Sequence, residues 1–236
     1  MQTLESILDT SINTVEDNAR TIFIRELMLS GWTFPQYNPD IAKKVIEEGV
    51  TVKGKTLYIS GEGFSDMIMN DFWTEKWDAR IWKEIDTIEF DKVPNNDIII
   101  HGKRLIGGKN CPKTFVFTGE CRLVANSFEN VTIKSKKHVS ISLNFYEKKG
   151  YTYFKNTRID ADKILMSIND LEQLEQLDMI AKCAFVSFND DDNQPHIDEE
   201  VLNDLKISRK VNELKFNLIR KHLAFEWHGM KWVKYF

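Results

Sequence analysis

The chain has little cysteine, no long apolar run and almost no excess charge, and each shortage excludes a class of protein. Its cysteines, Cys111, Cys121 and Cys183, are odd in number and form no C-x-x-C pair. The sequence therefore predicts neither a disulfide framework nor a four-thiolate zinc site, and a reduced, cytoplasmic setting is expected. The opening MQTLESILDT has no basic region and no long apolar stretch, so neither a signal peptide nor a membrane span is expected.

The charge balance disfavours a general polyanion binder. Lys and Arg number 32 against 36 Asp and Glu, so the net charge of -4 opposes strong nonspecific attraction to nucleic acid or an anionic membrane. A local basic face remains compatible with either partner. With 236 residues, 42% of them hydrophobic, the chain is long enough to bury a sizeable core.

Hydrophobic spacing predicts an α+β fold in one compact unit. Apolar residues recur at three- and four-residue steps near both ends, for example at Leu171, Leu174 and Leu177, which is typical of helices. We expect an N-terminal helical segment over residues 1–55, a β-rich core over 56–165 that includes an aromatic helix at 64–85, and C-terminal helices with a terminal hairpin over 166–236. The spacing of apolar residues over 4–15 predicts the first helix, and the alternation about Lys53 and Gly54 predicts a hairpin. The aromatic residues of 64–85 suit either a binding groove or the core, and burial needs fewer assumptions.

The β-rich core shows period-two alternation broken by short turns, which predicts about eight short strands. Two arrangements remain open: an antiparallel sheet, or a short solenoid in which successive coils stack. The segments SFENVTIKS (127–135) and YFKNTRIDA (153–161) match at Phe, Asn and Ile, 26 residues apart. Such matching is typical of a repeat, but no third copy with the same spacing is evident.

Catalytic and ligand-binding motifs are incomplete. GKRLIGGKN (102–110) lacks the first Gly and the final Ser or Thr of a phosphate-binding loop, so a turn is expected there. NDDDNQPHIDEE (189–200) lacks the Gly of a calcium loop and is expected to be a solvated acidic loop. His101 is the weak catalytic candidate, with Cys111 or Cys121 as its nucleophile, although a turn-edge histidine and packed thiols explain the same residues. No metal site and no cofactor are predicted.

Lysines and aromatic residues gather in two places, a pattern that a single-stranded nucleic-acid binder uses and that a solvated turn face also produces. The candidate binding residues are Lys134, Lys136, Lys137, Lys148, Lys149, Tyr146, Tyr151 and Trp232.

The first nine residues resemble a leader found on many proteins of Bacteroides-infecting phages, including crAss-like phages. Met1, Thr3, Leu4, Glu5, Ser6, Ile7, Leu8 and Asp9 match it, while Gln2 replaces its basic residue. Some proteins with this leader continue into leucine-rich or β-solenoid-like repeats, to which NCPKTFVFTGECRLV (110–124) is similar. The resemblance implies a phage or mobile-element origin.

Together these features predict a non-enzymatic interaction protein, either a virion-associated component or a binder of a host factor. Its expected partner is a phage or host protein, and its expected location is the host cytoplasm or the virion, without a membrane. The alternative is a nucleic-acid-binding protein or an enzyme that uses His101 and the lysines at 134–149.

Overall fold

The computed structural model describes most of the central β region and parts of both ends. The described residues are 19–24, 47–60, 81–91, 98–142, 153–168, 174–188, 208–218, 223–228 and 231–235. Within them, α-helix is confined to residues 19–24 and 47–49 and to α4 (Ile81–Glu84). None of these described helices has the length and apolarity needed to cross a lipid bilayer.

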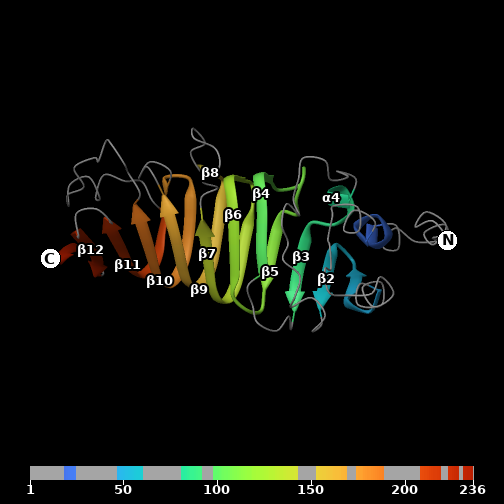
Figure 1. Cartoon of the computed structure of the whole chain (residues 1–236), viewed down its shortest axis with the longest axis horizontal. Helices are drawn as coiled ribbons and strands as arrows, with labels where there is room; N and C mark the ends of the chain where they lie inside the picture. The colour runs from blue at the N-terminus through green and yellow to red at the C-terminus, as the bar shows by residue number, and fades with distance from the viewer. Residues whose placement is uncertain are drawn as a thin grey trace, which may run out of the picture.

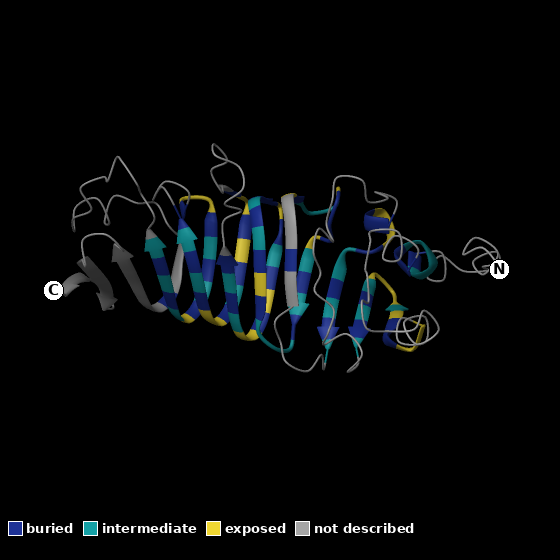
Figure 2. Ribbon diagram, viewed as in Figure 1, coloured by how far each residue is buried: buried dark blue, intermediate teal, exposed yellow. Residues whose placement is uncertain are grey.

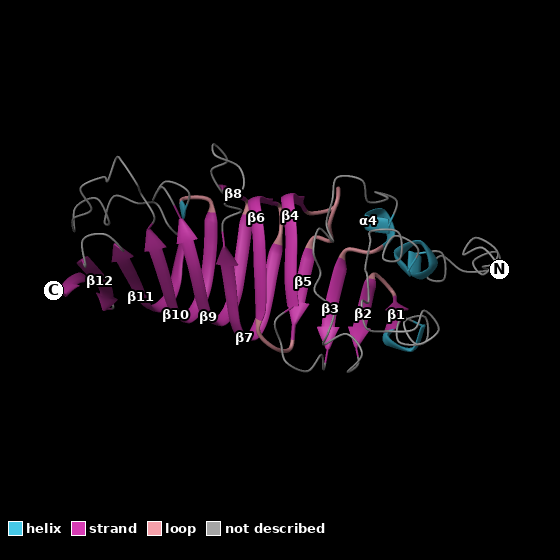
Figure 3. Ribbon diagram, viewed as in Figure 1, coloured by secondary structure: helices cyan, strands magenta, loops and turns pink. Residues whose placement is uncertain are grey.

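The described strands form a single sheet system that extends along the molecule (Figure 1, Figure 3). They are β1 (Val50–Lys53), β2 (Thr56–Ser60), β3 (Thr87–Asp91), β4 (Ile98–Ile106), β5 (Thr114–Phe117), β6 (Cys121–Glu129), β7 (Thr132–Ser142), β8 (Tyr153–Lys155), β9 (Thr157–Ile168), β10 (Leu177–Phe188), β11 (Ser208–Leu218), β12 (Leu223–His228) and β13 (Lys231–Tyr235). Ten of them follow one path, β1-β2-β3-β5-β7-β9-β10-β11-β12-β13.

Parallel pairing dominates the centre of this path. Every pairing from β2 through β3, β5, β7, β9 and β10 to β11 is parallel. The strands β4, β6 and β8 lie off the path and also pair in parallel. Because parallel neighbours need crossover connections, the chain winds in coils, and each coil adds strands beside those of the previous one. The antiparallel alternative for the centre is therefore wrong.

A buried row of apolar side chains joins successive coils. Leu57, Ile88, Phe115, Ile133, Ile159 and Met179 pair in register from β2 to β10, and all are fully buried. Side chains on either side of this row are more exposed, which gives the alternation of burial along the strands in Figure 2. The period-two pattern of the sequence is thus the consequence of one inward and one outward face.

The two matching segments occupy neighbouring coils. Phe128 pairs with Phe154, and their rings stack with centroids 5.6 Å apart. Ile133 pairs with Ile159 in the adjoining strands β7 and β9. Between them, Asn130 and Asn156 both have positive φ, 54° and 48°. The segments are therefore equivalent parts of two stacked coils.

The α+β class with long flanking helices is wrong. The described region is β-rich, and the expected C-terminal helices fall on the strands at 177–188 and 208–218. These segments contain apolar residues at three-residue steps, which suggested helices, and also apolar residues at every second position, which is typical of strands. In β11 the alternating residues Leu214, Phe216 and Leu218 pair in register with Ala184, Val186 and Phe188 of β10. Pairing with β10 satisfies the backbone of β11 and selects the strand.

Other local predictions match the described residues. A hairpin around Gly54 joins β1 to β2, and a second hairpin joins β12 to β13, both with antiparallel pairing. Of the aromatic helix predicted at 64–85, residues 81–84 are helical, with Ile81, Trp82 and the following Ile85 buried. The segment 64–80 and the predicted helix near residues 4–15 lie outside the described residues, as does the acidic loop 189–200.

Candidate interaction groove

An open groove with a volume of about 780 Å³ crosses the stack where β5, β7, β9 and β10 begin. It is lined by Lys113, Thr114, Asn130, Thr132, Asn156, Thr157, Arg158, Glu175, Gln176, Leu177 and Asp178. Thr114, Thr132, Arg158 and Asp178 pair in register across these four strands. The groove therefore runs across the strands, so each coil supplies its own segment of the wall.

The two asparagines form a ladder along this groove. The Nδ2 of Asn156 donates a hydrogen bond of 2.9 Å to the Oδ1 of Asn130. Asparagine tolerates the left-handed backbone at these corners because its short polar side chain can bond locally. Each corner directs the chain from one face of the coil into the next strand. The same residues thus support the bend and expose amide groups at the groove.

The charges of the groove are balanced but unevenly placed. Arg158 and Asp178 lie in adjacent strands, with Nη1 and Oδ2 3.7 Å apart. Lys113, next to β5, and Glu175, next to β10, are both exposed, and no ion pair joins either to another described residue. One end of the groove is consequently basic and the other acidic, with amides and hydroxyls between them.

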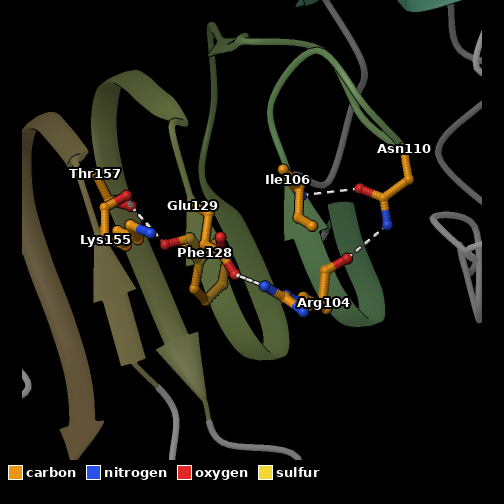
Figure 4. Close-up of polar contacts among 7 residues, drawn as sticks. All are labelled: Arg104, Ile106, Asn110, Phe128, Glu129, Lys155 and Thr157. Carbon is orange, nitrogen blue, oxygen red and sulfur yellow. Dashed lines mark hydrogen bonds and ion pairs between the residues drawn. The ribbon is translucent and has the colours of Figure 1, made fainter.

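Polar contacts join neighbouring coils next to the groove (Figure 4). Arg104 on β4 contacts Glu129 on β6, with Nη2 2.5 Å and Nε 2.7 Å from Oε1. The Glu129 side chain is only 9% exposed, so this contact offsets the desolvation of its carboxylate. Thr157 is buried, and its hydroxyl donates to the carbonyl oxygen of Phe128 at 2.7 Å. These bonds tie neighbouring coils together.

Gly107 and Gly108 of GKRLIGGKN lie in a tight turn directly after β4, as expected. The Asn110 side chain accepts a hydrogen bond from the Ile106 backbone N–H at 2.8 Å and donates to the Arg104 carbonyl at 2.6 Å (Figure 4). Gly107 lies so close to the next coil that a Cβ there would collide with the backbone carbonyl of Asn130. Gly108 has a φ of 80°. Both glycines are explained by backbone geometry.

Three of the predicted lysines lie on β7, and none of them lines the groove. Lys134 is exposed on β7 and pairs in register with Asp160 on β9. Lys136 and Lys137 are exposed at the register shift between Ser135 and His138, where the coil turns its other corner. We call this corner the lysine ridge; it comprises Lys136, Lys137 and His138 with Glu120, Asp162, Lys163 and Lys182 of adjoining coils.

The lysine ridge carries acids as well as bases. His138 Nδ1 lies 3.1 Å from a Glu120 carboxylate oxygen, and Lys182 Nζ lies 2.9 Å from an Asp162 oxygen. The lysines therefore do not form a purely basic surface.

The side chains of the remaining predicted site residues are not among those that the structure describes. His101 pairs with Val124 on β6, and Trp232 pairs with Trp227 on β12; their side chains lie outside what is described. Lys148, Lys149, Tyr146 and Tyr151 also fall outside the described residues. No group of three or more His, Cys, Asp or Glu side chains in the described part of the chain is placed to hold a metal ion.

The two candidate nucleophiles are unsuited to that role. Cys111 and Cys121 are buried, and this burial raises the pKa of both thiols well above the ordinary range. Since the thiolate is the nucleophile, a raised pKa leaves these groups protonated and unreactive. Both behave as small apolar residues of the core.

Sequence reasoning missed the acidic end of the groove because the third copy of the repeat is degenerate. In LEQLDM (174–179), Leu174 takes the place of Phe154, Gln176 that of Asn156, and Met179 that of Ile159. Allowing apolar residues to exchange with one another, and Gln with Asn, would have found it. Arg158, Glu175 and Asp178 would then have been recognised as parts of one surface.

These features define a parallel stack of β coils with a polar groove across one corner. No family model, curated protein or solved structure matches the chain.

Proposed function

We propose that this protein is a non-enzymatic interaction protein that binds a protein partner in the groove across β5, β7, β9 and β10. The observation that carries the proposal is the groove itself, in which neutral amides and hydroxyls separate charges of both signs. A balanced polar surface suits a protein segment better than a polyanion, because like charges are not concentrated. The leader resemblance extends the proposal to a phage-derived component of the virion or a binder of a host factor.

The wall of this groove is built on well-packed strands, which favours binding. Its walls belong to parallel strands whose inward side chains are fully buried, and its corners are bonded to one another through Asn130 and Asn156. A partner that binds here would not have to order the wall first, so little conformational entropy is lost by this protein on association.

Photocrosslinking tests the proposal. A photoreactive phenylalanine in place of the exposed Gln176, inside the groove, is compared with the same group in place of the exposed Arg122 on β6, outside it. Both proteins are mixed with purified virions and with host extract. We expect position 176 to capture a defined protein that position 122 does not, and the purified partner to bind Thr132→Arg at least about tenfold more weakly. Identical products from the two positions would refute the groove as the binding site.

The second candidate function is binding of single-stranded nucleic acid along the lysine ridge. The observation that favours it is that Lys136 and Lys137, together with Lys163 and Lys182 of the next coils, are exposed at one corner. Neighbouring strands are about 4.8 Å apart, so these ammonium groups can follow a phosphate backbone.

Salt dependence tests this second function. We expect Lys136→Glu with Lys137→Glu to weaken binding of a labelled oligonucleotide and to reduce the salt slope by about 1.4, two phosphate contacts being lost. Lys55→Glu with Lys83→Glu, at exposed positions elsewhere, is the charge-matched control. Absence of binding to DNA and RNA at low salt would reject this function.

A further inference from the structure

The groove has a direction, because two exposed charges that form no ion pair with another described residue lie at its opposite ends. Lys113 precedes β5 and Glu175 precedes β10. Three strand steps separate them, from β5 to β7, β9 and β10, which places them roughly 14 Å apart along the stack. Arg158 and Asp178 lie within 3.7 Å of each other and offset one another's charge between them.

Neighbouring described charges form no ion pair with Lys113 or Glu175. Lys155 is exposed in the coil next to Glu175, but no ion pair joins the two, and Lys155 pairs in register with Glu129. Lys109 is exposed in the same turn as Lys113 but does not line the groove. A ligand that spans the groove therefore meets a cation at one end and a carboxylate at the other.

We infer that the groove receives an extended segment of the partner protein that carries one acidic and one basic residue about four positions apart. This inference rests on the proposed function and names the chemistry of the segment. An extended chain advances about 3.3 Å per residue, so about four residues cover the distance between Lys113 and Glu175. The acidic side chain lies at Lys113 and the basic side chain at Glu175.

The amides between the two charges suit the backbone of such a segment. Asn130, Asn156 and Gln176 each offer an N–H donor and a carbonyl acceptor, whereas a helix would satisfy its own backbone groups internally. Thr114 and Thr132 add hydroxyls on the same wall. The groove therefore recognises the order of the two charges in the bound segment, and its amides contact the segment's backbone largely independently of the other side chains.

Synthetic peptides test the inference directly. Four eight-residue peptides rich in Thr and Asn carry Glu and Lys four positions apart, Glu and Lys adjacent, two Glu, or two Lys. Binding to the isotope-labelled full chain is followed by NMR shift changes. We expect the widely spaced mixed peptide to bind between about two and thirty times more tightly than the other three, the range given by two exposed ion pairs.

Charge-reversal variants supply the control. Lys113→Glu and Glu175→Lys are each expected to remove the preference for the mixed peptide, whereas Lys109→Glu and Glu84→Lys, at exposed sites outside the groove, leave it. The double variant Lys113→Glu with Glu175→Lys is expected to regain it, since the peptide can lie in the opposite direction.

Three outcomes overturn the inference. They are equal binding of all four peptides, tightest binding of a peptide with charge of one sign, and no binding at millimolar concentration. If position 176 captures a partner but the peptides give any of these three outcomes, the proposed function stands. Only the inferred order of acidic and basic residues in the bound segment is then rejected. Failure of the crosslinking would instead reject the proposed function.

Discussion

One interior row of side chains runs through two regions of the stack. In the first region, β3 and β5, the row is aromatic, whereas in the second region, β7, β9 and β10, it consists of small residues. Phe90 and Phe117 pair in register, and their rings stack with centroids 5.0 Å apart and planes 2° from parallel. The next members of the row are Ser135, Ala161 and Ala181. All five residues are buried. The row changes from aromatic to small residues within one strand step, and the register continues across the change.

The size of the side chains in this row depends on whether the strand ends or continues past the corner of the coil. β3 and β5 have 5 and 4 residues, whereas β7, β9 and β10 have 11, 12 and 12 and continue past the corner. A small side chain at the corner lets the backbone turn close to its neighbour. Ser135 shows the effect, because its hydroxyl donates to the carbonyl of Gly119 at 2.7 Å. Close packing is therefore reached by matching side-chain volume to the local space.

The largest expected effect comes from removing an aromatic ring of the first region. Phe117→Ala removes the stack with Phe90 and leaves a cavity, so we expect the free energy of unfolding to fall by about 3–5 kcal/mol. Urea denaturation followed by circular dichroism measures it. Val116→Ala, on the more exposed face of the same strand, is the control. Equal losses for both variants would mean that the aromatic row contributes no special packing.

The corners of the second region give the next effect. Asn156→Ala loses the amide bond to Asn130 and places an alanine at a φ of 48°, so we expect a loss of roughly 2–3 kcal/mol in unfolding free energy. Asn156→Gly loses the same bond without the backbone strain and is expected to cost about 1 kcal/mol. If the two variants unfold at the same urea concentration, the positive φ is not the source of the asparagine requirement.

Enlarging a small buried residue of the second region tests whether this region has room for a larger side chain. Ala161→Leu adds volume to a buried site between Ser135 and Ala181, and we expect a loss of about 1–3 kcal/mol through overpacking. Lys155→Leu adds a leucine at an exposed position and is expected to stay within about 0.5 kcal/mol. A more stable Ala161→Leu protein would show that this part of the interior has unfilled space.

The smallest effect concerns thiol reactivity and leaves stability unchanged. Burial raises the pKa of Cys111 and Cys121, whereas Cys183 on β10 is partly exposed. With a thiol-specific chromogenic reagent at pH 8, we expect Cys183 to react at least about tenfold faster than the other two in the native protein. Cys183→Ser should remove the fast phase. Fast reaction of two or three thiols would show that the core around Cys111 and Cys121 opens readily.

Much of the strand content was predictable, and the class of fold was not. The alternation in TFVF and CRLVA identified strands because one face of each is buried. The apolar steps at Leu171, Leu174 and Leu177 suggested a helix, yet Leu174 and Leu177 are consecutive inward residues on either side of a corner. A three-residue step across a corner is indistinguishable from a helical step in the sequence. The mistake therefore arose from geometry that only the coil supplies.

The site was predictable only in part. Lys134, Lys136 and Lys137 were identified as candidate binding residues, and they are exposed but do not line the groove. Glu175 and Asp178 were assigned to a helix, so their proximity to Lys113 and Arg158 was missed. Residues far apart in the chain become neighbours through the register of β5, β7, β9 and β10.

By itself, the sequence determined the alternation of inward and outward residues, the hairpin at Gly54 and the equivalence of Asn130 with Asn156, because these depend on local backbone preferences. The tertiary structure decided that the strands pair in parallel, that residues 208–218 form a strand, and that Lys113 and Glu175 face one groove. Backbone hydrogen bonds between coils select among conformations that local preference leaves nearly equal in energy.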